Sequence, residues 1–452
     1  MKKKLTVQEY VVVASMLFGL FFGAGNLIFP VHMGQMAGSQ LVPATLGFLI
    51  TGVGLPLLSV AALGISKSEG LFDLSRKVSR PYAYFFTCLL YLTIGPFFAI
   101  PRCATTAFTV GIEQAVPQAA EQLRLWLLVF SAVFFAAALL FSLFPGKILT
   151  WVGKILNPFF LLFLGILIIV ALVKPSAAIS AVAPEGAYAS QAFSTGFLEG
   201  YNTMDVLAGL AFGIIVVQVI RELGVTDADA VASSTVKAGV FSSLLMALIY
   251  LAVTVVGAQS RGLFATSENG GIALAQIARH YLGSAGLVIL AATVALSCLK
   301  TSVGLITSCA ETFCGMFPKG PGYRAWAVLF TLISFALSNF GLSTIISYSV
   351  PVLMFLYPLA IALVLLALFG RFYRHDRAVY ISVIVCTLLA ALYDLICALP
   401  EGLYDALHAD AVQAFGLRVL PFAGAGLGWI CPLALGFVIG LAVHLMQKFR
   451  TK

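Results

Sequence analysis

Two short polar interruptions inside apolar segments contain the residues whose types and spacing best suit ligand binding. The first spans Phe22–Asn26 and the second spans Glu199–Asp205. Glycine adopts backbone angles that are closed to other residues, so Gly23 and Gly25 allow a helix to break at the first interruption. Unwound backbone in an apolar environment leaves N–H and C=O groups without partners unless a cavity, water or ligand satisfies them. The two interruptions therefore predict a binding site.

The first interruption could bind an anion and a cation together. A helix half that restarts near Leu27 would present free N–H groups and a positive dipole end to an anion, and the last carbonyls of the preceding half suit a cation. Asn26 adds a side-chain carbonyl oxygen, which is a hard ligand. The alternative is that Gly23 and Gly25 only allow close packing of helices, as small residues do in membrane proteins.

The second interruption contains two carboxylates whose roles the sequence leaves open. Asn202 or Thr203 can cap a restarting helix, and Asp205 in its first turn would then complement the helix dipole. Asp205 could instead take part in coupling to a cation. A carboxylate at membrane depth is a functional candidate, so Glu199 has either a direct role or a position that faces a water-filled vestibule.

A cluster of hydroxyl groups surrounds a single lysine between Ser297 and Ser302. Such hydroxyls usually bond their own backbone or another helix, although Thr301 and Ser302 could also ligate a cation. At about 100° per residue, Lys300 would face roughly 150° away from the mean direction of those two hydroxyls. Because an unpaired lysine at mid-membrane is costly, we expect Lys300 to find a carboxylate, a hydroxyl cluster or a watery crevice. The alternative is a fixed ammonium that replaces a sodium ion.

Two further charges lie in apolar segments. Arg102 follows Pro96 and Pro101, and we expect its side chain to reach the outer interface by snorkelling. Asp394 is expected near the middle of the eleventh apolar segment, where it needs a partner that the sequence does not name.

Signatures of catalysis are weak. The five histidines lie far apart, and no HExxH, GxSxG, Walker or CxxC pattern occurs. The eight cysteines are scattered through apolar stretches, so neither a disulfide framework nor a zinc site is indicated. We therefore expect no enzymatic activity, and no cofactor apart from a coupling ion.

The composition requires a membrane around these residues. Of 452 residues, 61% are hydrophobic and 10% are charged, whereas soluble domains carry about 25% charged residues. The mean hydropathy is +1.04. From Val11 to Ser66 no Asp, Glu, Lys or Arg occurs, although about 20 apolar residues suffice to cross the hydrocarbon core. The chain is therefore expected to be a polytopic membrane protein.

Apolar runs separated by Pro, Gly and charged residues predict about twelve transmembrane segments. Two of them, beginning near Pro81 and near Ser284, are long enough to need a tilt, a break or an extension beyond the membrane. Lys and Arg in the short loops fall mainly on the side of the N-terminal Lys2-Lys3-Lys4 run, so both termini are expected in the cytoplasm. The basic residues behind the net charge of +8 lie at the ends of these segments, so no nucleic-acid partner is implied.

Interrupted helices at corresponding places in two halves indicate a transporter built from inverted repeats. The two interruptions fall in the first and sixth segments, with about five segments in each unit. We expect a first five-helix repeat at residues 1–175, a second, inverted repeat at 176–370, and two additional transmembrane helices at 371–452.

Four motifs carry a resemblance to a known family. They are Gly23–Pro30, Gly47–Thr51 with Gly54–Pro56, Gly200–Asp205 and Cys298–Glu311. In this order, through nearly the whole chain, they resemble the bacterial branched-chain amino acid:cation symporters, a family thought to be related to the LeuT-like amino acid–polyamine–organocation transporters. The resemblance implies an all-α LeuT-like fold with broken helices 1 and 6, and uptake of leucine, isoleucine and valine driven by sodium.

The resemblance implies a substrate site at the two breaks. Backbone amides around Ala24, Gly25 and Asn26 would hold the substrate carboxylate, and Asn26 could also ligate a sodium ion adjoining it. The second break would supply groups for the substrate ammonium from Tyr201, Asn202 and Thr203.

The resemblance also implies a second sodium site between the first and eighth helices. Its ligands would be the carbonyls of Gly19 and Phe22 and the hydroxyls of Thr301 and Ser302. Lys300 departs from the small or apolar residue expected at that place. Possible coupling residues are Glu199, Asp205 and Lys300.

These expectations combine into one function, sodium-coupled import of branched-chain amino acids by alternating access. The expected location is the bacterial cytoplasmic (inner) membrane, and the expected partners are leucine, isoleucine, valine and membrane lipid. The alternatives within transport are proton coupling and sodium-independent transport or exchange. The alternatives of another class are a membrane channel and an amino-acid sensor.

Overall fold

The computed structural model describes residues 4–68, 70–116, 119–144 and 147–450, and all side chains within them except those of residues 20, 147–157, 159, 160, 214, 228 and 450. Over these ranges the chain is helical and contains no β-strand. Lys2 and Lys3, which contribute to the predicted orientation, lie outside them. The predicted all-α class is confirmed.

The first half of the chain, up to residue 173, contains α1 (Val7–Phe21), α2 (Gly25–Ala37), η1 (Gly38–Gln40), α3 (Leu41–Leu49), η2 (Ile50–Gly54), α4 (Leu55–Ile65), α5 (Leu71–Arg76), α6 (Arg80–Leu92), η3 (Thr93–Phe97), α7 (Ala99–Val110), α8 (Ala120–Leu143) and α9 (Lys147–Val173). The next part contains η4 (Ile179–Ala181), α10 (Tyr188–Glu199), η5 (Gly200–Thr203), α11 (Asp205–Glu222), α12 (Ala228–Ser260), α13 (Gly270–Met316), α14 (Tyr323–Ser338) and α15 (Leu342–Phe369). The last part contains η6 (Gly370–Tyr373), α16 (Arg377–Cys397), α17 (Glu401–Ala406), α18 (Asp410–Val419), η7 (Ala423–Ala425) and α19 (Ile430–Arg450).

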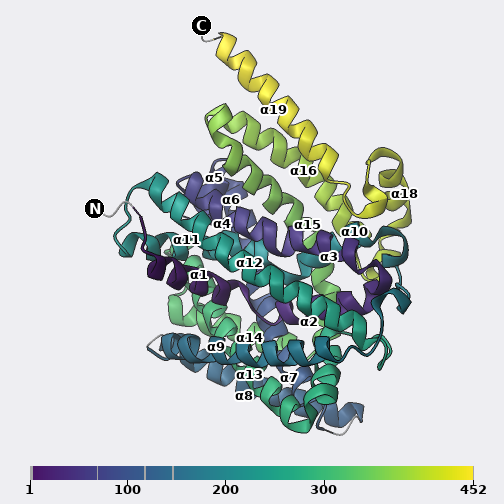
Figure 1. Ribbon diagram of the computed structural model, residues 1–452. Helices are drawn as coiled ribbons and strands as arrows, with labels where there is room; N and C mark the ends of the chain where they lie inside the picture. Colours follow the sequence, from purple (N-terminus) through teal and green to yellow (C-terminus); the bar gives the residue numbers. More distant parts are fainter. Residues whose placement is uncertain (1–3, 69, 117–118, 145–146, 451–452) are drawn as a thin grey trace.

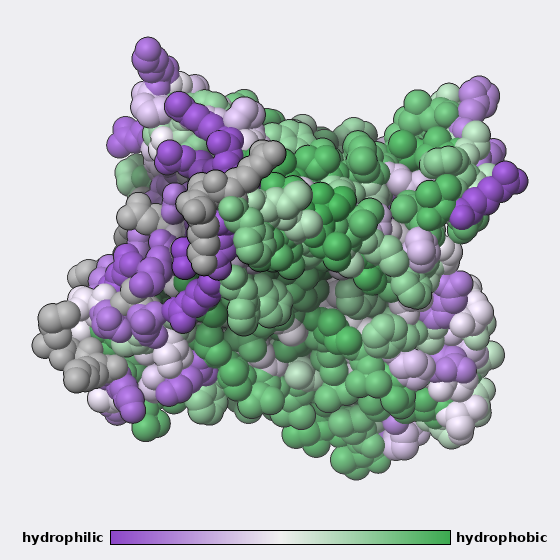
Figure 2. Space-filling model, turned by 90° about the horizontal axis from the view of Figure 1, so that it is seen from above, coloured by the Kyte–Doolittle hydropathy of each residue, from purple (hydrophilic) through white to green (hydrophobic). Residues whose placement is uncertain are grey.

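Helix length and surface composition fit a membrane environment. Eight helical stretches of the described chain are long and apolar enough to cross a bilayer, and three shorter apolar helices accompany them. Figure 2 shows a broad hydrophobic band with hydrophilic side chains concentrated on two opposite sides of it. The predicted total of twelve crossings remains a prediction, because these lengths alone do not establish it.

The first and sixth helices are interrupted where the sequence predicts. Helix α1 ends at Phe21 and α2 begins at Gly25, whereas α10 ends at Glu199 and α11 begins at Asp205. Figure 1 shows α1 and α2 near the middle of the bundle, beside the long helix α12, and both of them pack against α12. Helix α19 packs on α16 and extends away from the bundle.

The two long segments also depart from a straight helix. The segment that begins near Pro81 changes from α6 to the π-helical turn η3, where Gly95 has the non-helical angles φ −96° and ψ −122°. Helix α13 bends at Gly283, which has a φ of 66°. This positive φ is readily adopted by glycine and is uncommon for other residues, so the bend at this position needs a glycine.

Close helix crossings hold the second and sixth segments together. A Cβ on Gly47 would lie 2.1 Å from the Phe193 carbonyl oxygen, and a Cβ on Gly196 would lie 2.0 Å from the Ala44 carbonyl oxygen. The two glycines therefore let the backbones of α3 and α10 touch, in the manner of small residues at membrane helix interfaces. This contact fixes α10 directly before the second break.

Candidate functional site

A small cavity of about 50 Å³ lies where the two breaks meet. The elements around it are the end of α1, the start of α2, the third helical segment, the start of α11 and the middle of α13. Its polar side is formed by the first break and by Asn26, Arg102, Thr203, Asp205 and Thr301. Its apolar side is formed by Phe21, Ile94, Ala99, Met204, Ala208, Phe212 and Leu305. The cavity wall thus combines polar and apolar groups.

The first break leaves amide groups without acceptors beside this cavity. The Phe22 amide still donates to the Phe18 carbonyl, at 2.7 Å, and the Gly23 amide donates to Asn26 Oδ1, at 2.8 Å. The amides of Ala24, Gly25 and Asn26 find no acceptor among the residues that the structure describes. Because the first N–H groups of a helix have no partner in the preceding turn, this end of α2 can bind an anion.

The second break is held by a strained residue and a hydroxyl. Met204 has a φ of 62°, a left-handed conformation that is uncommon and unfavourable for a residue with a side chain. The Thr203 hydroxyl donates to the Gly200 carbonyl at 2.9 Å and accepts from the Asp205 amide at 3.3 Å. The N-cap residue of α11 is therefore Met204 rather than Asn202 or Thr203, and the Thr203 hydroxyl, one residue earlier, serves as the cap acceptor for the first amide of the helix. The Asn202 side chain instead donates to Glu199 Oε2 at 3.3 Å.

A buried hydrogen-bond network joins the two breaks. Asp205 Oδ2 accepts from Asn26 Nδ2 at 2.7 Å and from the Tyr250 hydroxyl at 3.1 Å, and Asn26 Nδ2 also contacts that hydroxyl. Hydrogen bonds to a charged carboxylate are about twice as strong as neutral ones. Asp205 therefore lies in the first turn of α11, as predicted, and also ties α11 to α2 and α12.

The expected position of Arg102 at the outer interface is wrong. Arg102 is 4% exposed, its Nη1 donates to the Asn202 carbonyl at 2.7 Å, and its guanidinium lies 5.1 Å from the Phe29 ring centroid. The physical reason is that α7, after the break at Gly95, is buried on every side from Ile100 to Val110. A side chain on this helix has no route to the interface, so Arg102 enters the cavity instead.

Helix α13 brings Thr301 against the first break. A Cβ on Gly23 would lie 3.6 Å from Thr301 Cγ2, and the Thr301 hydroxyl donates to the Ser297 carbonyl at 3.1 Å. The neighbouring Ser302 hydroxyl is buried and makes no hydrogen bond with any described residue. Lys300 is half-buried and does not line the cavity. Of the two predicted hydroxyl ligands, Thr301 is therefore the one that lies against the first break, just after the end of α1.

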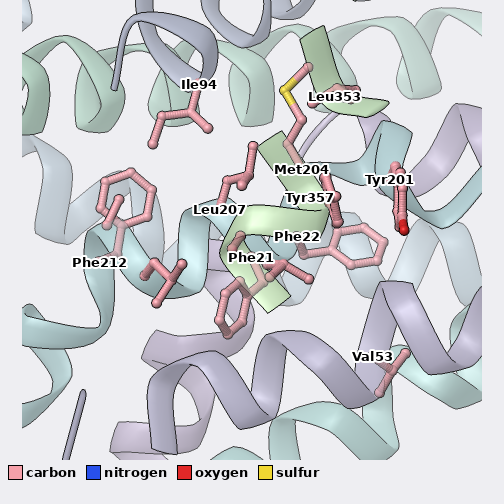
Figure 3. Packing of buried hydrophobic residues seen from close by; sticks show 14 of the residues in the cluster. Phe21, Phe22, Val53, Ile94, Tyr201, Met204, Leu207, Phe212, Leu353 and Tyr357 are labelled. Atoms are coloured by element: carbon pink, nitrogen blue, oxygen red, sulfur yellow. The ribbon is translucent and has the colours of Figure 1, made fainter. Parts of the chain in front are cut away.

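The remaining predicted residues lie around the cavity but do not line it. The Tyr201 ring stacks on the Tyr357 ring with 4.0 Å between centroids, and Figure 3 shows this pair apart from Ile94 and Phe212. Glu199, in the last turn of α10, is outside the cavity lining as well.

The predicted position of Asp394 is also corrected. It lies in the last turn of α16 and not near the middle of a segment, because this helix ends at Cys397 shortly before Pro400. The residue is 3% exposed, and the backbone of Gly428 approaches its carboxylate.

One residue of the network, Tyr250, has no recognisable signal in the sequence. Tyr250 lies in a long apolar stretch of α12 and is fully buried, so nothing in the pattern separates it from a packing residue. Arg102 did give a signal, since a charge inside an apolar segment is a functional candidate. The hydropathy pattern does not show where Arg102 lies relative to the break at Gly95.

Comparison with known proteins decides the family. A family model described as "Branched-chain amino acid transport protein" matches residues 6–447. The chain belongs to this branched-chain amino acid transport protein family. A member from Lactobacillus delbrueckii subsp. lactis, named branched-chain amino acid permease BrnQ, is 53% identical over 450 residues and the match covers all of both chains. The permease of the same name from Bacillus subtilis is 38% identical, again over all of both chains.

Two solved structures share the fold of this chain. The inward-facing conformation of Mhp1 matches 98% of this chain and 91% of its own, with a TM-score of 0.58 and 15% identity. MhsT in complex with L-phenylalanine matches 98% of this chain and 99% of its own, with a TM-score of 0.57 and 15% identity. The predicted LeuT-like fold with two broken helices is confirmed.

Proposed function

We propose that the protein imports leucine, isoleucine and valine together with sodium, by alternating access. The observation that carries the proposal is the cavity at the two helix breaks, whose wall combines free amides, a guanidinium and a carboxylate with aliphatic and aromatic side chains. An α-amino acid with a hydrophobic side chain combines charged and apolar groups in the same way. The names of the two permeases from Lactobacillus delbrueckii and Bacillus subtilis support the same substrate class.

The apolar part of the cavity wall suits a branched aliphatic side chain. Ile94 and Phe212 lie close together in this part of the wall (Figure 3), and Ala208 and Leu305 also belong to it. A hydrophobic pocket separates analogues that differ by one methylene by only about 1–3 kcal/mol. We therefore expect leucine, isoleucine and valine to compete with one another, and alanine and charged amino acids to compete poorly. A competition panel in which lysine or glutamate displaced labelled leucine better than valine would contradict this substrate class.

Sodium would bind between α1 and α13. The carbonyl of Gly19 lies in the last turn of α1, where helix carbonyls have no partner in a following turn. Thr301 contacts the break, and the buried Ser302 hydroxyl still needs a partner among the described residues. Together with the Phe22 carbonyl these groups would supply a set of oxygen ligands, which hard cations prefer.

The driving force is sufficient for accumulation. One charge moved across about 100 mV supplies about 2.3 kcal/mol, and a tenfold sodium gradient adds about 1.4 kcal/mol. The sum of roughly 3.7 kcal/mol supports an accumulation of roughly 500-fold.

The small cavity supports a mechanism in which helices move. On the same volume measure a water molecule needs about 10–15 Å³, so a cavity of about 50 Å³ holds a few waters and is smaller than leucine. Substrate entry then requires the helix halves around the breaks to separate, first on one side of the membrane and then on the other. With both termini in the cytoplasm, the end of α1 and the body of α11 form the inner side of the gate.

The test is leucine uptake into proteoliposomes with sodium, proton and potential gradients imposed separately. Uphill, saturable uptake that needs the sodium gradient is the expected result. Uptake driven by a proton gradient alone would show that protons, and not sodium, are the coupling ion. Downhill flux without accumulation would indicate a channel. Lys300→Met should keep the sodium requirement. Sodium-independent uptake by the native protein, with sodium dependence gained in Lys300→Met, would show that the lysine occupies the cation site.

A further inference from the structure

Two opposite charges line the central cavity, one from α7 and one from α11. Arg102 and Asp205 are 4% and 2% exposed, and neither forms an ion pair within the described part of the chain. Each of the two charges attracts the other, but a buried charge without an opposite charge in direct contact is costly. Each group therefore gains from an opposite charge at contact distance, and the cavity that both line is the place where a ligand can supply it.

The guanidinium of Arg102 is oriented toward the first break. Its Nη1 donates to the Asn202 carbonyl at 2.7 Å, which fixes the plane of the group. Its Nη2 lies 2.9 Å from the point that a Cβ on Gly25 would occupy. Only a glycine at this position allows such an approach, and it places the guanidinium beside the free amides at the start of α2. A guanidinium is a rigid fork of donors that matches a carboxylate.

The carboxylate of Asp205 has acceptor capacity left for a cation. Both of its side-chain hydrogen bonds, from Asn26 and from Tyr250, fall on Oδ2. Oδ1 accepts no hydrogen bond from any residue in the described ranges, and Asp205 lines the cavity. An ammonium group carries three donors and no acceptor, so it matches this oxygen.

We propose that Arg102 and Asp205 bind the two charged ends of the amino-acid zwitterion, the guanidinium holding the carboxylate and the Asp205 carboxylate holding the ammonium. This inference rests on the proposed function and adds the two side chains that recognise the charged groups of the substrate. Helix α7 supplies one charge and α11 the other, so the matching ligand carries both a carboxylate and an ammonium. The site and the bound zwitterion are then each neutral overall.

The arrangement also links the ligand to both breaks. Arg102 bonds the carbonyl of Asn202 in η5 and lies over the ring of Phe29 in α2. Asp205 bonds Asn26 in α2. A zwitterion bound between the two charges therefore contacts the groups that hold α2 and α11 in place, which are the elements expected to move.

The test compares leucine with two neutralised analogues. Leucinamide keeps the ammonium and lacks the carboxylate, and 4-methylpentanoate keeps the carboxylate and lacks the ammonium. Binding to the purified protein is measured as ligand-dependent thermal stabilisation up to millimolar concentrations, which also detects weak ligands. Sites that use buried polar groups for recognition reject analogues lacking the matching group very strongly, so we expect both analogues to bind about 100-fold more weakly than leucine.

The variants assign each charge to its group. In Arg102→Gln the affinity for leucine should fall about 100-fold. The preference for leucine over leucinamide should shrink to about threefold or less, while the preference for leucine over 4-methylpentanoate should remain. Asp205→Asn should show the opposite pattern. Arg102→Lys keeps the charge and should keep both preferences with about tenfold weaker binding. Arg124→Gln removes an arginine of α8 outside this cavity and should change neither.

The outcomes separate the inference from the proposed function. If the native protein transports leucine but Arg102→Gln keeps its preference over leucinamide, the guanidinium has only a structural role and the inference is overturned. Native protein that binds leucinamide within about threefold of leucine overturns it equally, even if Arg102→Gln does not fold. If the native protein neither binds nor accumulates leucine, the proposed function itself fails.

Discussion

Both breaks interrupt a helix beside the central cavity, but different groups stabilise them. The first break contains glycines, and its Gly23 amide donates a hydrogen bond to Asn26 Oδ1. The second contains only one glycine, and it is held by Met204 in a left-handed conformation and by the hydroxyl of Thr203. The first break therefore leaves space next to its backbone, whereas the second fills that space with side chains.

This difference assigns different functions to the breaks. The open backbone of the first break lets Arg102 approach Gly25 and leaves amides for an anion. The filled second break supplies a precisely held carboxylate, Asp205, whose position is set by the cap before it and by Asn26 and Tyr250. Substitutions that add atoms should damage the first break most, and substitutions that remove hydrogen bonds should damage the second.

The largest effect is expected from Gly25→Leu. A Cβ at this position would lie 2.9 Å from Arg102 Nη2 and 3.3 Å from Phe29 Cε2, and the rest of the side chain would occupy the space of the substrate carboxylate. Since hydrogen bonds to charged groups contribute about 1.5–3 kcal/mol each, leucine binding should fall about 100-fold or more. Equilibrium binding of labelled leucine to purified protein measures this.

Gly23→Ala is the matched control for that variant. Its Cβ would make ordinary contacts of 3.6–3.8 Å with Thr301 and Asn26, so leucine binding should change less than threefold, by roughly 0.6 kcal/mol. Native affinity in Gly25→Leu, with membrane insertion unchanged in both variants, would favour a role of these glycines in helix packing alone.

The link between the breaks should respond to Tyr250→Phe. This change removes the hydroxyl that donates to Asp205 and keeps the ring that packs against Phe48. One hydrogen bond to a charged group contributes about 1.5–3 kcal/mol, so leucine uptake should fall about tenfold. Tyr82→Phe is the control, because the buried Tyr82 hydroxyl makes no hydrogen bond with the described residues. Equal effects of the two changes would show that the network is not needed for transport.

A smaller effect is expected at the cap of the second break, in Thr203→Val. The valine keeps the shape of the side chain but neither donates to Gly200 nor accepts from the Asp205 amide. Loss of a helix cap costs about 0.5–2 kcal/mol, so uptake should fall about fivefold and thermal stability should decrease. Thr195→Val removes a hydroxyl that bonds only the Gln191 carbonyl in the same helix. If this control lowers uptake as much as Thr203→Val, the cap does not position Asp205.

The smallest effect is expected outside both breaks, at Glu185. Hydrogen bonding from Thr266 and the nearby charge of Arg261, 2.5 Å away, lower the pKa of this carboxyl. Because the pKa is lowered in the folded protein, the stabilisation is present above the ordinary glutamate pKa and disappears as the pH falls through the lowered value. Partly exposed pairs contribute about 0–1 kcal/mol. Glu185→Gln should therefore lower thermal stability slightly at neutral pH and less as the pH falls below about 4.

The control for Glu185→Gln is Asp229→Asn. Asp229 pairs with Arg371, but both side chains are about 70% exposed, at 71% and 67%, so this change should have no measurable effect. A loss of stability in Glu185→Gln that grows as the pH falls would contradict the sign of the predicted dependence.

Much of the fold could be predicted from the sequence because the membrane restricts the choices. Apolar segments of this chain in lipid are expected to be helices, so the composition predicts the all-α fold class. The polar stretches at Gly23–Asn26 and Gly200–Asp205 stand out within these segments. Both breaks were predicted to within a residue or two. The motif beginning at Gly47 was recognised only by resemblance, and the structure supplies its cause in the backbone contact with α10.

The side-chain partners could not be predicted because they depend on contacts distant in sequence. Asn26, Asp205 and Tyr250 come from three different helices, and no spacing in the sequence relates them. The expectation that Arg102 lies at the outer interface fails because the chain changes direction at Gly95. That change comes from backbone angles, which hydropathy does not report. A residue of this kind is placed only by the packing of α7 among its neighbours.

The central claim is that leucine binds between the two breaks. The most direct measurement is the structure of the protein determined with leucine and sodium. We expect leucine in contact with the first break, with its charged groups toward Arg102 and Asp205 and its side chain toward Ile94 and Phe212. Leucine located instead in the larger apolar pocket of about 740 Å³ between Phe97, Tyr348 and Leu403, with the central cavity unchanged, would contradict it.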